Sequence, residues 1–303
     1  KNKVYFYTME EGLYEVDVYS LDVTKLYEDG NMRTPPDVAG PLLPGYHGKG
    51  AYVSQKRLVV ANNGEYDWRN TSESGSLSEW DGRDWKVIER KQFTEVTGPG
   101  GLYGNQDDDD PIWSIGWDQK SLILKVRDGG EWLTYRLPKA SFTYDGQHGW
   151  HTEWPRIRDI GQDKWLMTMH GMFWAFPPDF GRDQTSGIYP LSSYLKIIPD
   201  FAPWNGMLVM GCDDASMFDN ALVGQPQSNF WFIKKDQLDD FGPKIGFGGP
   251  WIDDKVEAYQ TSDPFLVSGF DRIMLYAEHD SDEGIDLLVE HRILGINDWV
   301  TWK

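Results

Sequence analysis

A short unit of two strands recurs along this chain and limits the folds that the chain can adopt. Each copy has an apolar run, a tight polar turn and a second apolar run that ends in polar residues. The copies span residues 48–65, 110–129, 151–171, 196–214 and 263–280, and residues 3–12 resemble the second strand of a unit that lacks its first. Gly, Asp, Asn and Pro separate the runs, which is the pattern of strands and turns.

Further strand-like runs follow several copies, so that each unit has about four strands and the units are spaced by roughly 40 to 65 residues. Units of this kind are typical of propeller blades. We therefore expect residues 1–303 to form a single all-β domain, a β-propeller with six to seven four-stranded blades. The half-unit at residues 3–12 indicates that the two ends of the chain complete one blade together.

Charge, apolar runs and aromatic content limit the kinds of molecule that this protein can bind. The net charge of -19, from 48 acidic and 29 basic residues, argues against nucleic acid and anionic membrane surfaces, which both select for basic patches. No apolar run approaches the ~18 residues that a membrane span needs, so we expect no membrane insertion. The 15 Trp, 15 Tyr and 14 Phe either fill the core of the protein or stack on sugar rings.

The repeat also predicts where functional groups gather. In a hairpin, the start of the first run lies beside the end of the second, so the polar ends of all copies should share one face. Five of the six histidines belong to this set. The candidates on this face include His47, Asn63, Glu65, Asp107 to Asp110, Arg127, His151, Glu153, His170, Asp213, Asp214 and His279.

Two kinds of chemistry fit these groups. Converging imidazoles suit a divalent transition metal or proton transfer near neutral pH, and the alternative is that each histidine caps its strand end. Carboxylates such as Glu65, Asp213 and Asp214 suit acid–base work on a glycosidic bond, although carboxylates at strand ends also make turns. The four carboxylates at 107–110 would suit a calcium ion as oxygen ligands, and the alternative is that they form a solvated loop.

Residues 147–158 hold the densest mixture of aromatic and charged side chains in the sequence. Aromatic rings can stack on a sugar ring while guanidinium groups hold its carboxylate, which predicts a site for an acidic sugar. Alternation along a strand places Arg156 and Arg158 on the same side. The substrate-binding candidates here are Trp150, Glu153, Trp154, Arg156 and Arg158, and from other copies Asn63 and Arg127.

The phrases GYHGKGAYVSQ, ANNGE, GWHTEWPRIRDIG, MTMHGMF and MGCDDAS resemble bacterial β-propeller proteins of polysaccharide breakdown, which include propeller-fold polysaccharide lyases and glycoside hydrolases. This resemblance implies a carbohydrate-active enzyme, a lyase or glycoside hydrolase acting on an acidic or deoxy-sugar glycan. His47, His151 and His170 would then serve as acid–base groups. The alternative is a non-catalytic propeller that binds carbohydrate or protein.

The resemblance extends to cofactor and compartment. Oligogalacturonate lyases hold a metal with histidines of the propeller, and His151, His170 and His279 are the analogous residues here. We therefore expect a divalent metal ion (Mn, Zn or Ca), no organic cofactor and an oligo- or polysaccharide as partner. A periplasmic or secreted protein fits this role, and a cytoplasmic one is the alternative.

Overall fold

The strands of this chain form six antiparallel sheets, and the prediction of an all-β fold is confirmed. The computed structural model describes residues 2–28, 45, 47–64, 75–105, 107–141, 154–213, 229–293 and 298–302. Helix is limited, within these residues, to one short 3₁₀ turn, η2 (Lys235–Gln237). No helix in the described part of the chain has the length and apolar character needed to cross a bilayer.

Within the sheets of three or four strands, each strand pairs with the next one in sequence. The first sheet contains β1 (Lys3–Tyr7), β2 (Gly12–Asp17) and β3 (Val23–Glu28). The second contains β4 (Gly48–Ser54), β5 (Arg57–Asn62), β6 (Ser76–Trp80) and β7 (Trp85–Glu89). The third contains β8 (Gln92–Thr97), β9 (Ile112–Trp117), β10 (Leu122–Asp128) and β11 (Glu131–Leu137).

The fourth sheet contains β12 (Arg156–Arg158), β13 (Trp165–Met169), β14 (Met172–Phe176) and β15 (Tyr189–Ser193). The fifth contains β16 (Ile197–Trp204), β17 (Met207–Asp213) and β18 (Asn229–Ile233). The last pairs β19 (Glu290–His291) with β20 (Val300–Thr301).

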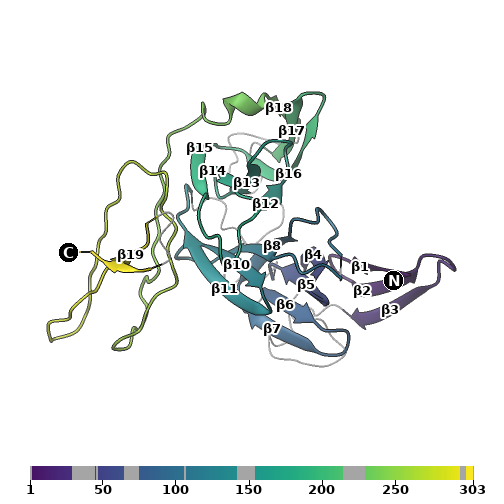
Figure 1. Cartoon of the computed structure of the whole chain (residues 1–303), viewed down its shortest axis with the longest axis horizontal. Coiled ribbons are helices and arrows are strands. Elements are labelled where there is room, and N and C mark those ends of the chain that lie inside the picture. Colours follow the sequence, from purple (N-terminus) through teal and green to yellow (C-terminus); the bar gives the residue numbers. More distant parts are fainter. Residues whose placement is uncertain are drawn as a thin grey trace, which may run out of the picture.

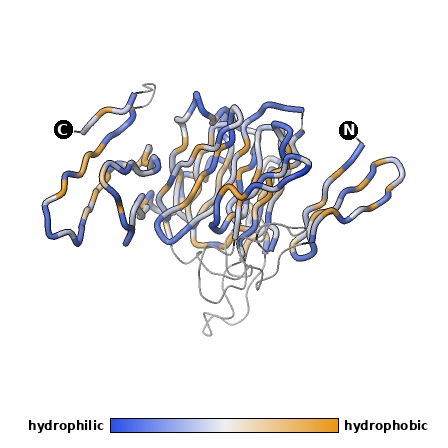
Figure 2. The backbone as a smooth tube through the Cα atoms, turned by 90° about the horizontal axis from the view of Figure 1, so that it is seen from below, coloured by the Kyte–Doolittle hydropathy of each residue, from blue (hydrophilic) through white to orange (hydrophobic). Residues whose placement is uncertain are grey.

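The first five sheets follow one another around an arc (Figure 1). Their innermost strands lie side by side, because β4 contacts β8, β8 contacts β12, and β12 contacts β16. The last strands β7, β11 and β15 lie on the outside of the arc (Figure 1). The arc is open between the β16–β18 sheet and the β1–β3 sheet, and the two chain ends lie toward opposite ends of the long axis (Figure 2).

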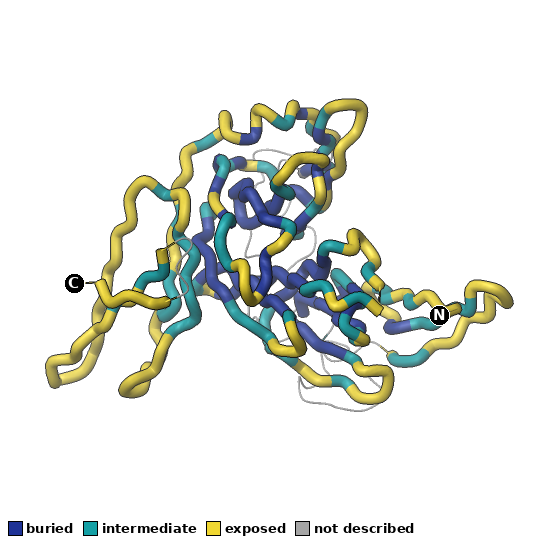
Figure 3. The backbone as a smooth tube through the Cα atoms, viewed as in Figure 1, coloured by how far each residue is buried: buried dark blue, intermediate teal, exposed yellow. Residues whose placement is uncertain are grey.

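Four apolar clusters lie between neighbouring sheets and hold the arc together. The largest joins the third and fourth sheets, and it includes Trp113, Leu124, Met167 and Trp174, all almost fully buried. The other clusters join the first and second sheets, the second and third, and the fourth and fifth. The buried residues concentrate in this central part of the molecule (Figure 3). Apolar burial between sheets is therefore the main source of stability.

Four of the predicted two-strand copies form hairpins. They correspond to β4–β5, β9–β10, β12–β13 and β16–β17. Residues 3–12 supply β1, an edge strand of a three-stranded sheet, which fits a unit without its first strand. The second copy differs from the others, because β8 precedes it in the same sheet. This copy therefore forms the second and third strands of its sheet.

The prediction of a strand pair at residues 263–280 is wrong for this structure, since no strand is found there. This segment instead attaches to the outer strand β11. The backbone N–H of Arg136 donates to the carbonyl of Pro264 at 2.8 Å, and the N–H of Leu266 donates to the carbonyl of Arg136 at 2.7 Å. These bonds satisfy the backbone of the segment without a hairpin.

Candidate functional site

One end of the sheets collects several of the predicted polar residues. We call it the His47 end, and it is the end at which β4, β8, β12 and β16 begin. His47 precedes β4, and Asn63 follows β5, whose last residue pairs with Gly48. Trp154 precedes β12, and His170 lies in the turn beside the start of β12. The structure thus places His47, Asn63 and His170 at one end, where the sequence predicted them, and Trp154 lies there as well.

Trp154 lies beside two cations from different sheets. The Nζ atom of Lys49, on β4, lies 4.2 Å from the centroid of the indole ring. The guanidinium carbon of Arg156, on β12, lies 5.5 Å from the same ring. An indole face attracts cations through its quadrupole, so the ring holds both groups at the start of the inner strands.

A charge cluster, buried except for Asp200, continues along the inner strands, and we call it the axial cluster. It contains Glu95 on β8, Arg156 and Arg158 on β12, and Asp200 on β16. Arg156 donates to a Glu95 carboxylate oxygen at 3.1 Å, and Arg158 donates to the other Glu95 oxygen. Arg158 also donates to Asp200 at 3.1 Å. The cluster therefore links three sheets through charged side chains, and both arginines face the same side, as predicted.

Burial and charge act in opposite directions on these groups. Burial raises the pKa of Glu95, and the guanidinium groups of Arg156 and Arg158 oppose that rise. Burial also acts to lower the pKa of Arg158, but the carboxylates of Glu95 and Asp200 outweigh it, so the pKa of Arg158 is raised. Arg158 thus stays cationic between the carboxylates of Glu95 and Asp200.

His47 and Asn63 are both buried at the His47 end. His47 is 3% exposed, and its Nδ1 atom lies 3.8 Å from a carboxylate oxygen of Glu10. Asn63 is fully buried, and among the described residues neither atom of its side-chain amide has a hydrogen-bond partner. A buried amide of this kind is costly unless a partner satisfies it.

His170 has a structural role that rests on its backbone carbonyl and on the packing of its ring. It is fully buried in the β13–β14 turn, with a φ of 43° at His170 and 80° at Gly171. Its carbonyl accepts hydrogen bonds from the backbone N–H groups of Ala140 and Ser141. Its ring packs against Trp117 with centroids 4.9 Å apart. Positive φ at both positions fits a tight hairpin turn.

His279 does not join His170. It lies exposed in the segment that attaches outside β11, because that segment forms no hairpin. Within the described part of the chain, no three His, Cys, Asp or Glu side chains are grouped as metal ligands. His151, the third expected ligand, lies outside the described residues, so the metal ion stays a prediction.

The placement of Arg127 and residues 107–110 at the His47 end is wrong. Ser54 and Gln55, at the opposite end of β4, bond to the carbonyl oxygens of Asp108 and Asp110. Arg127 donates to Glu79 at 3.0 Å and also to Gln55. The cause is β8, which shifts this copy by one strand and so reverses its direction. Arg127 is therefore a buried link between two sheets.

Some predicted site residues lie outside the described residues, namely Glu65, Trp150, Glu153 and Asp214. The same holds for the side chain of Asp213. Sequence reasoning missed Glu95 and Asp200, which complete the axial cluster. Their signal is a carboxylate within an otherwise apolar or β-branched strand, QFTEVT and IIPDFAPW, where a buried charge needs a partner.

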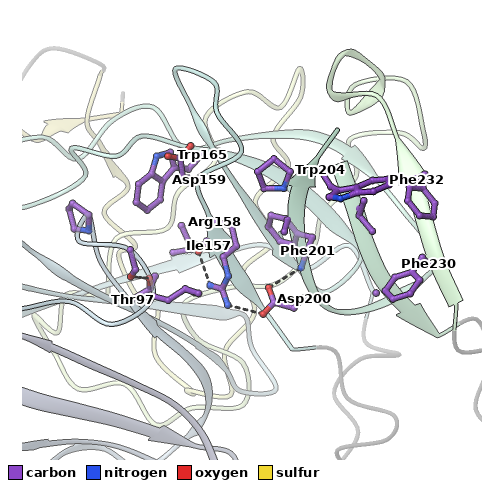
Figure 4. Close-up of a pocket in the computed structure, with 17 residues that line it drawn as sticks. Thr97, Ile157, Arg158, Asp159, Trp165, Asp200, Phe201, Trp204, Phe230 and Phe232 are labelled. Atoms are coloured by element: carbon purple, nitrogen blue, oxygen red, sulfur yellow. Dashed lines mark hydrogen bonds and ion pairs between the residues drawn. The ribbon is translucent and has the colours of Figure 1, made fainter. Parts of the chain in front are cut away.

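A cleft of about 880 Å³ opens beside the axial cluster. In Figure 4, Arg158 and Asp200 lie at one side of it, and Trp204, Phe230 and Phe232 extend along the β16–β18 sheet. Most of the lining is apolar, including Ile157, Trp165 and Phe201. The molecule thus has a charged site at the His47 end and an apolar cleft on the open side of the arc.

Comparison with known proteins adds no assignment. No protein-family model matches the chain, and no curated protein matches it.

Proposed function

We propose that this chain is a β-propeller that binds an acidic glycan at the His47 end of its axis. The observation that carries the proposal is the position of Trp154, whose indole ring lies beside Lys49 and Arg156 of the innermost strands. An indole face stacks on a sugar ring, and ammonium and guanidinium groups attract the carboxylate of a uronic acid.

The arrangement of the sheets supports the propeller. Successive sheets contact through their first strands, and an apolar cluster fills each interface between them. Radial packing of meandering four-stranded sheets around an axis is the architecture of a propeller. The ligand would bind at the mouth of the axis where the inner strands begin, which is the His47 end.

The distribution of charge supports an acidic ligand. The chain has a net charge of -19, yet on its inner strands the three cations Lys49, Arg156 and Arg158 outnumber the carboxylates of Glu95 and Asp200 that pair with the arginines. An anionic ligand would be repelled by most of the surface, so the local cations provide a place that favours it. Asn63 adds a buried amide at the same end, which can exchange hydrogen bonds with sugar hydroxyl groups.

Cleavage of the glycan, by a lyase or glycoside hydrolase, stays a prediction of the sequence. His47 is the described candidate that lies beside a carboxylate at this end, so it is the residue that we expect to transfer a proton. Absorbance near the band of unsaturated uronates, followed with purified protein, distinguishes a lyase from a hydrolase. A periplasmic or secreted location fits such a substrate and also stays a prediction.

Calorimetry tests the binding proposal. We expect a galacturonate oligomer to bind more tightly than a galactose oligomer of the same length, with an affinity that falls as salt rises. Trp154→Ala should weaken binding by about tenfold or more, equivalent to roughly 1.4 kcal/mol. Lys49→Met should lower the affinity for the acidic oligomer and leave the affinity for the neutral oligomer unchanged.

Tyr103→Ala is the matched control, because Tyr103 is exposed on a loop at the opposite end of the strands. This variant should keep the affinity of the parent protein. Equal affinity for the acidic and neutral oligomers, or full affinity in the correctly folded Trp154→Ala variant, contradicts the proposal.

A further inference from the structure

The open side of the arc presents two surfaces that sheets normally cover. One face of the β16–β18 sheet packs in the core through Leu208, Met210 and Ile233. The other face leaves Trp204 62%, Phe230 71% and Phe232 47% exposed. Three large aromatic rings on one sheet face form an apolar patch, which in a monomer marks a site of interaction.

Across the opening, β1 is the second bare surface. It pairs with β2 on one side, and no strand of the described residues pairs with its other side. An edge strand of this kind has free backbone N–H and C=O groups that favour pairing with another segment. A segment that fills the opening must therefore have an apolar face that packs on β16–β18, and it must lie beside β1.

Residues 256–291 have the sequence of such an occupant. Asp263-Pro264 is followed by Gly269-Phe270-Asp271 at the same spacing as Asp110-Pro111 and Gly116-Trp117-Asp118. The earlier copy forms β9 and β10, whose residues are almost all fully buried. The alternating run VEAYQT at 256–261 and the more apolar run IDLLVEH at 285–291 flank the later copy, as β8 and β11 flank the earlier one.

This segment is poorly covered where it lies in the structure. Ile273, Met274, Leu275 and Tyr276 are 56%, 95%, 64% and 80% exposed, although the corresponding run in β10 is buried. Exposure of four consecutive large apolar side chains is unfavourable in water. The attachment to β11 consists of a few backbone bonds, the ion pairs Arg136–Asp263 and Lys120–Asp254, and the partly buried side chains of Leu266 and Phe270.

We propose that residues 256–291 fold as a further four-stranded sheet that fills the opening and closes the ring. The strands are 256–261, 265–270, 273–279 and 285–291, in the order of β8 to β11. The open arrangement is the second state of the same chain. Closure covers Trp204, Phe230 and Phe232, buries residues 273–276 and places a sheet beside β1. Because the segment is tethered, its effective concentration exceeds that of a separate partner.

Closure also gives a role to the apolar cleft. The rings that line its β16–β18 side belong to the face that the new sheet would cover. That side of the cleft is then a seat for the chain's own segment, while Thr97, Ile157 and Trp165 of the third and fourth sheets line the rest. The charged His47 end is left as the ligand site. The inference stands apart from the proposed function, because it rests on the other side of the arc.

Spin labels at Asn2 and Ser281 test the closure, in a Cys212→Ala background that removes the one native thiol. In the open structure β1 and the C-terminal segment lie toward opposite ends of the long axis (Figure 1). In the closed ring they belong to neighbouring sheets, which pack ~10 Å apart, so the label distance should fall below about 30 Å. A label pair at Asn2 and Thr24, within one sheet, is the control and should not change.

The closed ring predicts a short-distance population in the monomer. A single long distance overturns the proposal, as does a short distance that occurs only in a dimer, because the latter indicates exchange of the segment between two copies.

A second measurement uses stability. Met274→Asp should lower the melting temperature by about 5 °C or more if residue 274 becomes buried. Ile245→Asp, at a site 61% exposed and outside the segment, should leave it unchanged. Equal melting temperatures for both variants and the parent contradict closure.

Discussion

The hairpin β9–β10 and residues 263–280 start from the same pattern and end in different environments. Both contain Asp-Pro and, six residues after the Asp, Gly followed by an aromatic residue and Asp. In β9–β10, Trp113, Trp117 and Leu124 are almost fully buried. Around 273–276 the side chains are exposed. Local pattern thus favours a hairpin, but a hairpin persists only where neighbouring sheets cover both faces.

The neighbours of the two segments explain the difference. The β8–β11 sheet packs against the second sheet on one face and the fourth on the other. Residues 263–280 contact the outer strand β11 and gain only partial cover, with Leu266 and Phe270 packed at the edge of the largest cluster. Burial supplies the free energy that offsets the entropy of ordering a strand, and here it is small.

The largest expected effect is the difference in the free energy of unfolding between a Leu→Ala substitution in β10 and one in residues 263–280. Leu124→Ala should lower the free energy of unfolding by about 2–5 kcal/mol, because it leaves a cavity in a close-packed core. Leu275→Ala should cost clearly less, because only the closed state buries that side chain. Urea denaturation measures both. Equal costs would mean that 263–280 is as buried as β10 in the dominant state, and that the open arrangement is rare.

A smaller effect concerns the attachment to β11. Arg136 is buried and bonds to Asp118, Asp263 and Ser121. Asp263→Ala removes the bond from the segment and leaves Asp118 to hold the guanidinium. We expect amide exchange of residues 263–266 to quicken about tenfold, with little change in β9 and β10. Faster exchange throughout the third sheet would show that the two regions unfold together.

The smallest effect is a dependence on acid. Burial acts to raise the pKa of Asp254, but hydrogen bonds from the Ile252 backbone and from Lys120 outweigh it, so its pKa is lowered. Because the pKa of Asp254 is lower in the folded protein than in the unfolded chain, its ionised carboxylate stabilises the attachment at a pH above the unfolded pKa. This stabilisation is lost as the pH falls below about 4. Proteolysis of residues 250–263 should increase in that range, and Asp254→Asn should remove the dependence. Cleavage that is independent of pH in the parent protein contradicts this assignment.

Much of the architecture could be predicted from sequence, because apolar runs and turn residues are local signals. The all-β class and four hairpins follow from them. The prediction that the two chain ends complete one blade together is wrong for this structure, because β1 and β20 belong to different sheets. The direction of the copy at 110–129 could not be predicted. β8 has the run QFTEVT, whose Glu95 breaks the apolar pattern, so the strand before this copy was not recognised. One missed strand moved Arg127 and residues 107–110 to the wrong end.

The site was predicted in part for the same reason. His47, Asn63, Trp154 and Arg156 lie at one end because their strand ends are correctly aligned. The ion pairs of Glu95 and Asp200 with the arginines depend on contacts between β8, β12 and β16, which no local pattern encodes. The predicted position of His279 at the His47 end is wrong because it depends on whether residues 256–291 form a sheet.

A double-mutant cycle between Glu95 and Arg156 tests the central claim most directly, namely that the inner strands of successive sheets converge on one charged axis. These residues lie on β8 and β12, and their side chains form an ion pair at 3.1 Å. Urea denaturation of Glu95→Gln, Arg156→Met and the double variant gives the coupling free energy. We predict a coupling of about 1–3 kcal/mol. Additive effects of the two substitutions would show that the strands do not meet, and would contradict the account.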